Sequence, residues 1–164
     1  DALPLDLTVD GADEVDPHLH LLKGYGNALL RERIVAAASK QLVILVGPER
    51  VAEKLVPVLG TRGKLPVEVV PFALPLVTGW LARLGLPATR VLAADGAPFV
   101  SDNGNPILHA AVGPIADPHA LDRTLHAVPG VVGHGLFLGM ADRVIVEHAD
   151  GRVETRTHPA GPQK

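Results

Sequence analysis

The chain has 164 residues, of which 47% are hydrophobic and 20% charged, so it can bury a core and form one or two small domains. Its formal net charge is -3 and it has no run of Lys or Arg, which argues against a nucleic-acid partner. It has no cysteine for a disulfide, and its apolar runs are far shorter than the roughly 18 residues of a membrane span. We therefore expect a soluble, cytoplasmic protein without a membrane partner.

The first predicted elements are a strand, a loop, a helix and a second strand. Residues 5–9 alternate as a strand does and run into the turn signal Asp10-Gly11. Residues 28–39 favour a helix with Asn27 as N-cap, and apolar side chains all round it predict that it is mostly buried. Residues 42–46 are typical of a fully covered parallel strand. This order indicates a crossover unit of an α/β sheet, and nothing precedes its first strand to cover it, so we expect a truncated chain.

The elements after residue 64 follow the β-α-β-β-α-β order of a ferredoxin-like domain. We expect strands at 66–70, 88–93, 99–101 with 106–111 around the turn at 102–105, and 131–138, and helices at 74–84 and 118–127. A strand at 144–146 would return to the first sheet, and residues 148–164 would form a loosely held tail. The predicted organisation is an α/β domain with a Rossmann-like parallel sheet, residues 1–64 and 139–164, and a smaller α+β domain, residues 65–138.

Carboxylates, a lysine and glycines gather within the first 33 residues. They lie in the segments Asp10-Gly11-Ala12-Asp13-Glu14, Lys23-Gly24-Tyr25-Gly26-Asn27 and Leu30-Arg31-Glu32-Arg33. Ligands of open α/β sheets bind beyond the strand ends, where Asp10 is expected. Burial in an apolar helix raises the pKa of a carboxyl such as Glu32 toward that of a general base, while Lys23 and the helix N-terminus oppose this. Taken singly, these are a turn, a solvated helix residue and a surface lysine; together they predict an active site.

Six blocks of the chain, in order, resemble ribose-5-phosphate isomerase of the A type. They are Asp10 to Glu14, the turn at Lys23, Leu30 to Arg33, Leu65 to Pro71, Ser101 to Asn105 and Pro129 to Val132, and the resemblance covers residues 5 to 147. It implies interconversion of D-ribose 5-phosphate and D-ribulose 5-phosphate through an enediolate, with no metal or organic cofactor. It also implies a small-molecule sugar phosphate as ligand and a homo-oligomer, either a dimer or a tetramer.

The resemblance also implies roles for individual residues. Glu32 would be the general base and Lys23 the cation that faces the developing oxyanion. Asp10 and Asp13 would bind sugar hydroxyls and assist ring opening. The substrate-binding set implied by the resemblance comprises Gly11, Ala12, Gly24, Tyr25, Gly26 and Arg50.

Some positions depart from the family pattern. Arg50 stands where the family carries a lysine, His109 stands where an aspartate is usual, and Tyr25 and Asn27 interrupt a glycine-rich run. The family's Gly-Thr-Gly-Ser-Thr phosphate loop has no counterpart, so we expect this chain alone to bind ribose 5-phosphate poorly and to turn it over slowly.

Two other functions stay open from the residues alone. One is a non-catalytic sugar-phosphate-binding or regulatory module of the same fold. The other is a metal-dependent phosphatase or transferase with Asp10, Asp13 and Glu14 as oxygen ligands. The pair His18 and His20 has metal-ligand character, but no third ligand is near in sequence, so we expect no metal there.

Overall fold

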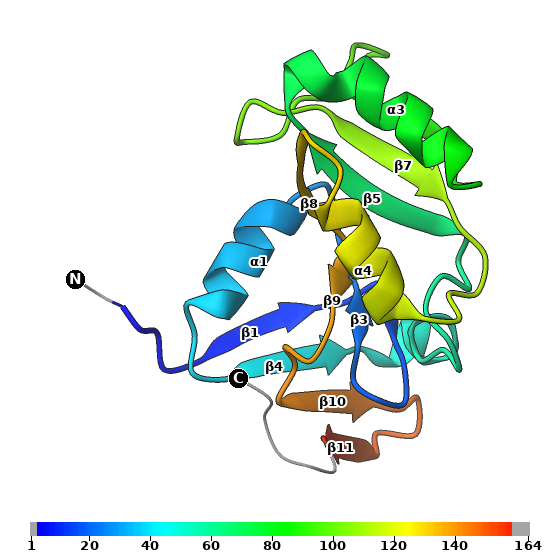
Figure 1. Ribbon diagram of the computed structural model, residues 1–164. Coiled ribbons are helices and arrows are strands. Elements are labelled where there is room, and N and C mark those ends of the chain that lie inside the picture. Colours follow the sequence, from blue (N-terminus) through cyan, green and yellow to red (C-terminus); the bar gives the residue numbers. More distant parts are fainter. Residues whose placement is uncertain (1–2, 159–164) are drawn as a thin grey trace.

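The computed structural model describes residues 3–158, which form three sheets and four α-helices (Figure 1). The sheet orders are β1-β4-β10-β11, β2-β3-β9 and β6-β7-β5-β8. The helices are α1 (Leu29–Ala37), α2 (Val51–Lys54), α3 (Leu74–Arg83) and α4 (Pro118–His126), with 3-10 turns at Pro48–Arg50 and Pro71–Ala73. The strands are β1 (Thr8–Gly11), β2 (Glu14–Val15), β3 (Leu21–Leu22), β4 (Leu42–Val46), β5 (Lys64–Val69), β6 (Ala88–Arg90), β7 (Ile107–Ala111), β8 (Val131–His134), β9 (Leu136–Phe137), β10 (Arg143–Glu147) and β11 (Val153–Thr157).

The first sheet contains the predicted parallel unit. Strands β1, β4 and β10 run parallel, with Val9 opposite Val43 and Val144 opposite Ile44, and β11 joins β10 antiparallel. The apolar run 42–46 forms β4, and the return of the chain through β10 is confirmed. Because alternate side chains of a strand face opposite sides, one face of β4 enters the core and the other carries Leu45, which is 47% exposed. The prediction that β4 is fully covered is therefore wrong.

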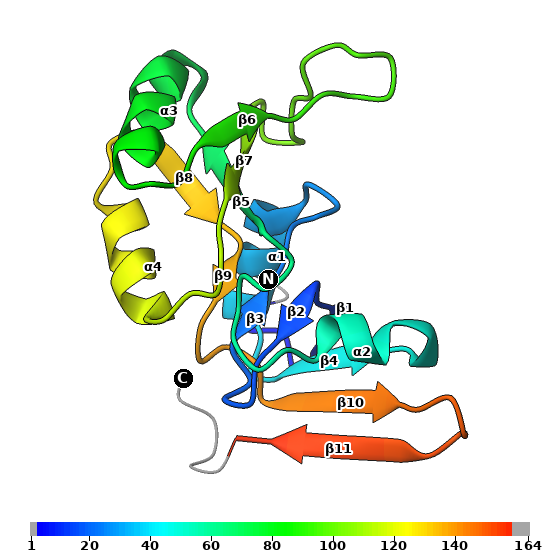
Figure 2. The same ribbon diagram turned by 90° about the vertical axis from the view of Figure 1, so that its right-hand side faces the viewer.

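The sheet of β6, β7, β5 and β8 has the strand order and antiparallel pairing expected of a ferredoxin-like unit. Its helices α3 and α4 lie on one face (Figure 2). The predicted strand 131–138 is divided at Gly135 into β8, which stays in this sheet, and β9, which pairs with β3. The small β2-β3-β9 sheet thus joins the two larger ones, and the domain limits at residues 64, 65, 138 and 139 stay a prediction.

Four local predictions are wrong. Helix α1 begins at Leu29 with Ala28 as N-cap, because Asn27 has a φ of 66° and makes no capping bond. The helix is also only partly buried, since Ile34 is 57% exposed and only Leu29 and Ala36 are buried. The tail carries strand β11, while residues 159–164 lie outside the described part. In the described part, the expected strand at 99–101 is a loop, and no helix is long and apolar enough to span a membrane.

The uncovered part of the first sheet carries a prediction about association. Strand β1 is an edge strand, and Leu7 and Val9 are each about half exposed, as is Leu45. Exposed edges and apolar faces promote self-association. We expect the 164-residue chain to scatter light at concentrations where the double variant V9K/L45K stays monodisperse. If F72K, on the fully exposed Phe72 of another face, abolished the scattering instead, the associating surface would lie there.

Candidate active site

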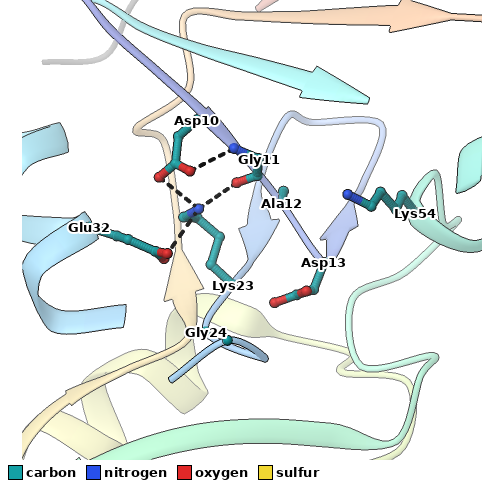
Figure 3. A pocket seen from close by; sticks show the side chains of 9 residues that line it. Asp10, Gly11, Ala12, Asp13, Lys23, Gly24, Glu32 and Lys54 are labelled. Carbon is teal, nitrogen blue, oxygen red and sulfur yellow. Dashed lines mark hydrogen bonds and ion pairs between the residues drawn. The ribbon is translucent and has the colours of Figure 1, made fainter. Parts of the chain in front are cut away.

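A pocket of about 160 Å³ opens where β1 ends, between α1 and α2 (Figure 3). Each part of the wall comes from a different element: the end of β1, the loop after it, the turn after β3, the start of α1 and the end of α2. The lining residues are Asp10, Gly11, Ala12, Asp13, Lys23, Gly24, Gly26, Glu32 and Lys54. Carboxylates, ammonium groups and backbone amides therefore meet in one small, polar cavity.

The ammonium of Lys23 occupies the centre of the site. Its Nζ lies 3.0 Å from Asp10 Oδ2 and 3.3 Å from Glu32 Oε2, and it donates a hydrogen bond to the carbonyl of Gly11. The residue is only 3% exposed. A buried ammonium is costly unless it is paired, and here two carboxylates and a carbonyl pair it. The lysine is thus held in one position rather than free to move as a surface side chain.

The Glu32 carboxyl has a raised pKa. Burial is the largest cause, and the charge of Asp10 adds to it, whereas the charge of Lys23 and its hydrogen bond act in the opposite direction. The pKa rises overall because partial burial at the start of α1 disfavours the charged form of the carboxyl. A raised pKa makes the carboxylate a better proton acceptor than an exposed glutamate, which is what a general base needs.

The two aspartates are fixed by backbone amides. Asp10 Oδ1 accepts a hydrogen bond of 2.7 Å from the amide of Gly11, and Asp13 Oδ2 accepts one of 2.9 Å from the amide of Tyr25. The bond from Tyr25 connects the loop after β1 to the turn after β3. Both carboxylates face the pocket, and each keeps a capacity to accept further hydrogen bonds from hydroxyl groups.

Two residues of the predicted substrate-binding set lie outside the pocket lining. The ring of Tyr25 contacts the cations of Arg62 and Lys64, at 5.0 and 4.0 Å from its centroid. Arg50 is exposed and ends the 3-10 turn before α2. The cation that this region contributes is Lys54, which extends from α2 toward the side of Asp13 (Figure 3). Lys54 follows Arg50 by four residues, one helical turn, so a helix at this point could have indicated it.

Glu14 does not join the other two carboxylates. It is fully buried, and its oxygens accept hydrogen bonds of 2.6 and 2.7 Å from the amides of Gly60 and Arg62. It therefore holds the loop before β5 and is not free to ligate a metal. The structure does not assemble the three-carboxylate site with Asp10 and Asp13.

One other group of metal-ligand type occurs among residues 3–158. Ligand atoms of Asp122, His126 and His134 all lie within 4.8 Å of one another. The amide of Leu136 donates to His134 Nδ1, so the ring proton of this neutral histidine belongs on Nε2, the atom that faces His126 Nδ1 at 2.9 Å. Burial lowers the pKa of His134 to about 2, which keeps the ring neutral. The Nε2 proton of His134 faces His126 Nδ1 and, at 3.3 Å, Asp122 Oδ1, so groups of the protein itself account for this cluster.

Gly24 is required by the packing of the site, which gives a testable prediction. Its φ is +98°, and a Cβ there would lie 2.8 Å from the Cβ of Leu29 at the start of α1. We expect G24A to lower the free energy of unfolding by about 1–3 kcal/mol, because a positive φ is unfavourable for alanine and its Cβ would push α1 away. The matched control is G26A, since a Cβ on Gly26 meets nothing within 4 Å. Equal urea midpoints for G24A and the unsubstituted chain would contradict the prediction.

Comparisons with known proteins agree on one family. Residues 1–151 match the family model described as ribose 5-phosphate isomerase A (phosphoriboisomerase A). The chain is 52% identical to the ribose-5-phosphate isomerase A of Roseiflexus castenholzii over 92% of its own length and 62% of that protein. For the protein of Thermomicrobium roseum the identity is also 52%, over 90% and 61% of the two lengths. The chain thus spans a little over three fifths of these relatives.

Solved structures show the same similarity in three dimensions. A D-ribose-5-phosphate isomerase in complex with phospho-erythronic acid superposes with a TM-score of 0.85 at 37% identity, covering 93% of this chain and 65% of that one. The enzyme from Plasmodium falciparum gives a TM-score of 0.86 at 32% identity, with 94% and 66% covered. The predicted fold class, a parallel α/β sheet with a smaller antiparallel α+β unit, is confirmed.

Proposed function

The chain belongs to the ribose 5-phosphate isomerase A family, and we propose that its pocket interconverts D-ribose 5-phosphate and D-ribulose 5-phosphate. The observation that carries the proposal is the Lys23 ammonium held 3.3 Å from the Glu32 carboxylate and 3.0 Å from Asp10. A base beside a fixed cation is what aldose-ketose isomerisation needs. The reaction moves a proton between neighbouring carbons while negative charge develops on oxygen.

In this proposal Glu32 transfers the proton. Its carboxylate takes the proton from the carbon next to the carbonyl, which leaves an enediolate, and then returns it to the neighbouring carbon. The raised pKa of Glu32 favours the first step, and the protonated carboxyl that results is the acid for the second. One residue thus serves both steps, which requires that it face both carbons from one side.

Lys23 stabilises the intermediate. Its ammonium is already desolvated and fixed, so it requires little reorganisation when the oxyanion forms. Asp10 and Asp13 accept hydrogen bonds from sugar hydroxyls, which orients the open-chain sugar in the pocket. Substrate binding through Gly11, Ala12, Gly24 and Gly26 is part of the same proposal.

The substrate in this proposal carries a phosphate. A relative was solved with phospho-erythronic acid, so we propose a sugar phosphate as the ligand here too. Lys54 is the lining cation that no carboxylate within the described residues pairs at 4.0 Å or less, and it is available for a phosphate or a hydroxyl. We also propose a homo-oligomer, a dimer or tetramer, and a cytoplasmic location, as the resemblance implies.

The experiment that tests the function separates proton transfer from metal chemistry. The chain is treated exhaustively with EDTA and assayed on ribose 5-phosphate in heavy water. If its turnover is too slow to measure, a version extended with the family's phosphate loop is used instead. We expect turnover to survive, and deuterium to enter the product at the carbon that receives the proton. Loss of turnover that Mg²⁺ restores would contradict the proposal and favour a metal-dependent enzyme.

A further inference from the structure

Arg33, the residue after Glu32 in α1, contacts a strand segment across the molecule and does not line the pocket. Its Nη2 donates hydrogen bonds to the carbonyl of His134, 3.0 Å away, and to the carbonyl of Leu136. Its Cζ lies 4.8 Å from the centroid of the Phe137 ring. The guanidinium therefore binds the end of β8 and the whole of β9.

The same segment holds Lys23. The amide of Lys23 donates a bond of 2.8 Å to the carbonyl of Gly135, and β3, which precedes it, pairs with β9. Its Nζ lies 5.6 Å from the ring of Phe137, the ring that Arg33 also contacts. A Cβ on Gly135 would come within 2.3 Å of the carbonyl oxygen of Lys23, so the backbones at these two residues approach as closely as glycine allows.

Arg33 at this position costs free energy of folding. Burial lowers the pKa of its guanidinium, and within residues 3–158 no carboxylate lies within 4.0 Å of it. Its buried Nε has no hydrogen-bond partner in that part of the chain either. Partial burial of a cation with no carboxylate at ion-pair distance costs free energy, which the two carbonyls and the more distant charge of Asp122 offset only in part. The guanidinium donates to both carbonyls through Nη2 while it lies over the Phe137 ring, a combination that a neutral side chain or a compact ammonium does not supply.

We propose that Arg33 is a positioning residue. It sets the contact between the Glu32 carboxylate and the Lys23 ammonium by holding α1 against the β8–β9 segment, which in turn holds Lys23. The inference rests on the proposed function, since only that function makes the contact catalytic. The role is geometric: burial raises the pKa of Glu32 and Lys23 lowers it, whereas the charge of Arg33 is not among the groups that shift it. Without the guanidinium, the start of α1 would move away from Lys23 and admit water.

The test measures Glu32 directly in the 164-residue chain. Carbon-13 labelled glutamate is titrated by NMR, and the Glu32 carboxyl resonance is assigned by its loss in E32Q. We expect R33K and R33M both to lower the measured pKa of Glu32 by about half a pH unit, because the loss of burial outweighs the loss of Lys23. R33K keeps the positive charge, so if Arg33 acted through its charge alone, Glu32 would titrate in R33K as it does in the unsubstituted chain. The matched control is R31M, which removes the exposed arginine on the other side of Glu32 and should not change the titration.

A second measurement is turnover in a version with measurable activity. A displaced base lowers kcat by about 10- to 100-fold with KM nearly constant, and the acidic limb of the pH profile follows the shifted pKa. If a variant were merely less folded, its turnover would be lower at every pH, and the pH of the acidic limb would not change. Native-like Glu32 titration in folded R33K overturns the inference, as does failure of both variants to fold, which would make Arg33 a determinant of the fold. Neither result touches the proposed function, which is tested separately by the turnover of E32Q and by the assay after EDTA treatment.

Discussion

E32Q is expected to turn over ribose 5-phosphate about 10²- to 10⁴-fold more slowly than the unsubstituted chain, the usual contribution of a positioned general base. Glutamine keeps the shape of the side chain and can still contact Lys23, but it cannot accept the proton. KM should change little, because Glu32 is not one of the groups proposed to bind hydroxyls or phosphate. Both chains are compared at the same length, so any weakness of phosphate binding affects them equally.

The pH dependence of turnover provides the internal control. Glu32 must be ionised to accept a proton, and its pKa is raised, so turnover should fall as the pH drops through that raised value. The acidic limb should be absent from the residual turnover of E32Q. Turnover of E32Q within about threefold of the unsubstituted chain would remove Glu32 from the mechanism.

The elements that the sequence predicted well are those whose pattern depends on few distant contacts. The apolar run 42–46 had the length and composition of a buried strand, and it forms β4. The order of elements after residue 64 sufficed for a ferredoxin-like unit, because strand order follows from connection length and handedness. Lys23, Glu32 and Asp10 were close in sequence, and the structure brings them into contact.

The predictions that failed depended on tertiary contacts. Glu14 belongs to the acidic segment by sequence, yet the amides of the loop at 60–62 take both of its oxygens. The interruption of 131–138 at Gly135 follows from the close approach of Lys23, which no local pattern encodes. Arg50 was taken from the family pattern, and because the short helix α2 was not predicted, Lys54, one turn later, was not considered.

K23M is expected to reduce turnover by about 10²- to 10³-fold, the range for removal of one fixed group that stabilises a developing oxyanion. Methionine resembles the lysine stem in length and lacks the charge. The change also leaves the carboxylates of Asp10 and Glu32 without the cation between them. Because Lys23 lowers the pKa of Glu32 while Asp10 raises it, the pKa of Glu32 should rise further in K23M.

The two effects of K23M are separable by measurement. The acidic limb of the kcat profile should move to higher pH, and the reduced kcat should persist at pH values where Glu32 is fully ionised, because the oxyanion still lacks its partner. K54M is the matched control, since it removes a lining ammonium that does not contact Glu32 within ion-pair distance. It should raise KM more than it lowers kcat. If K23M and K54M affected kcat equally and neither moved the acidic limb, the activity would depend on either lining cation alike, and not on the specific contact of Lys23 with Glu32.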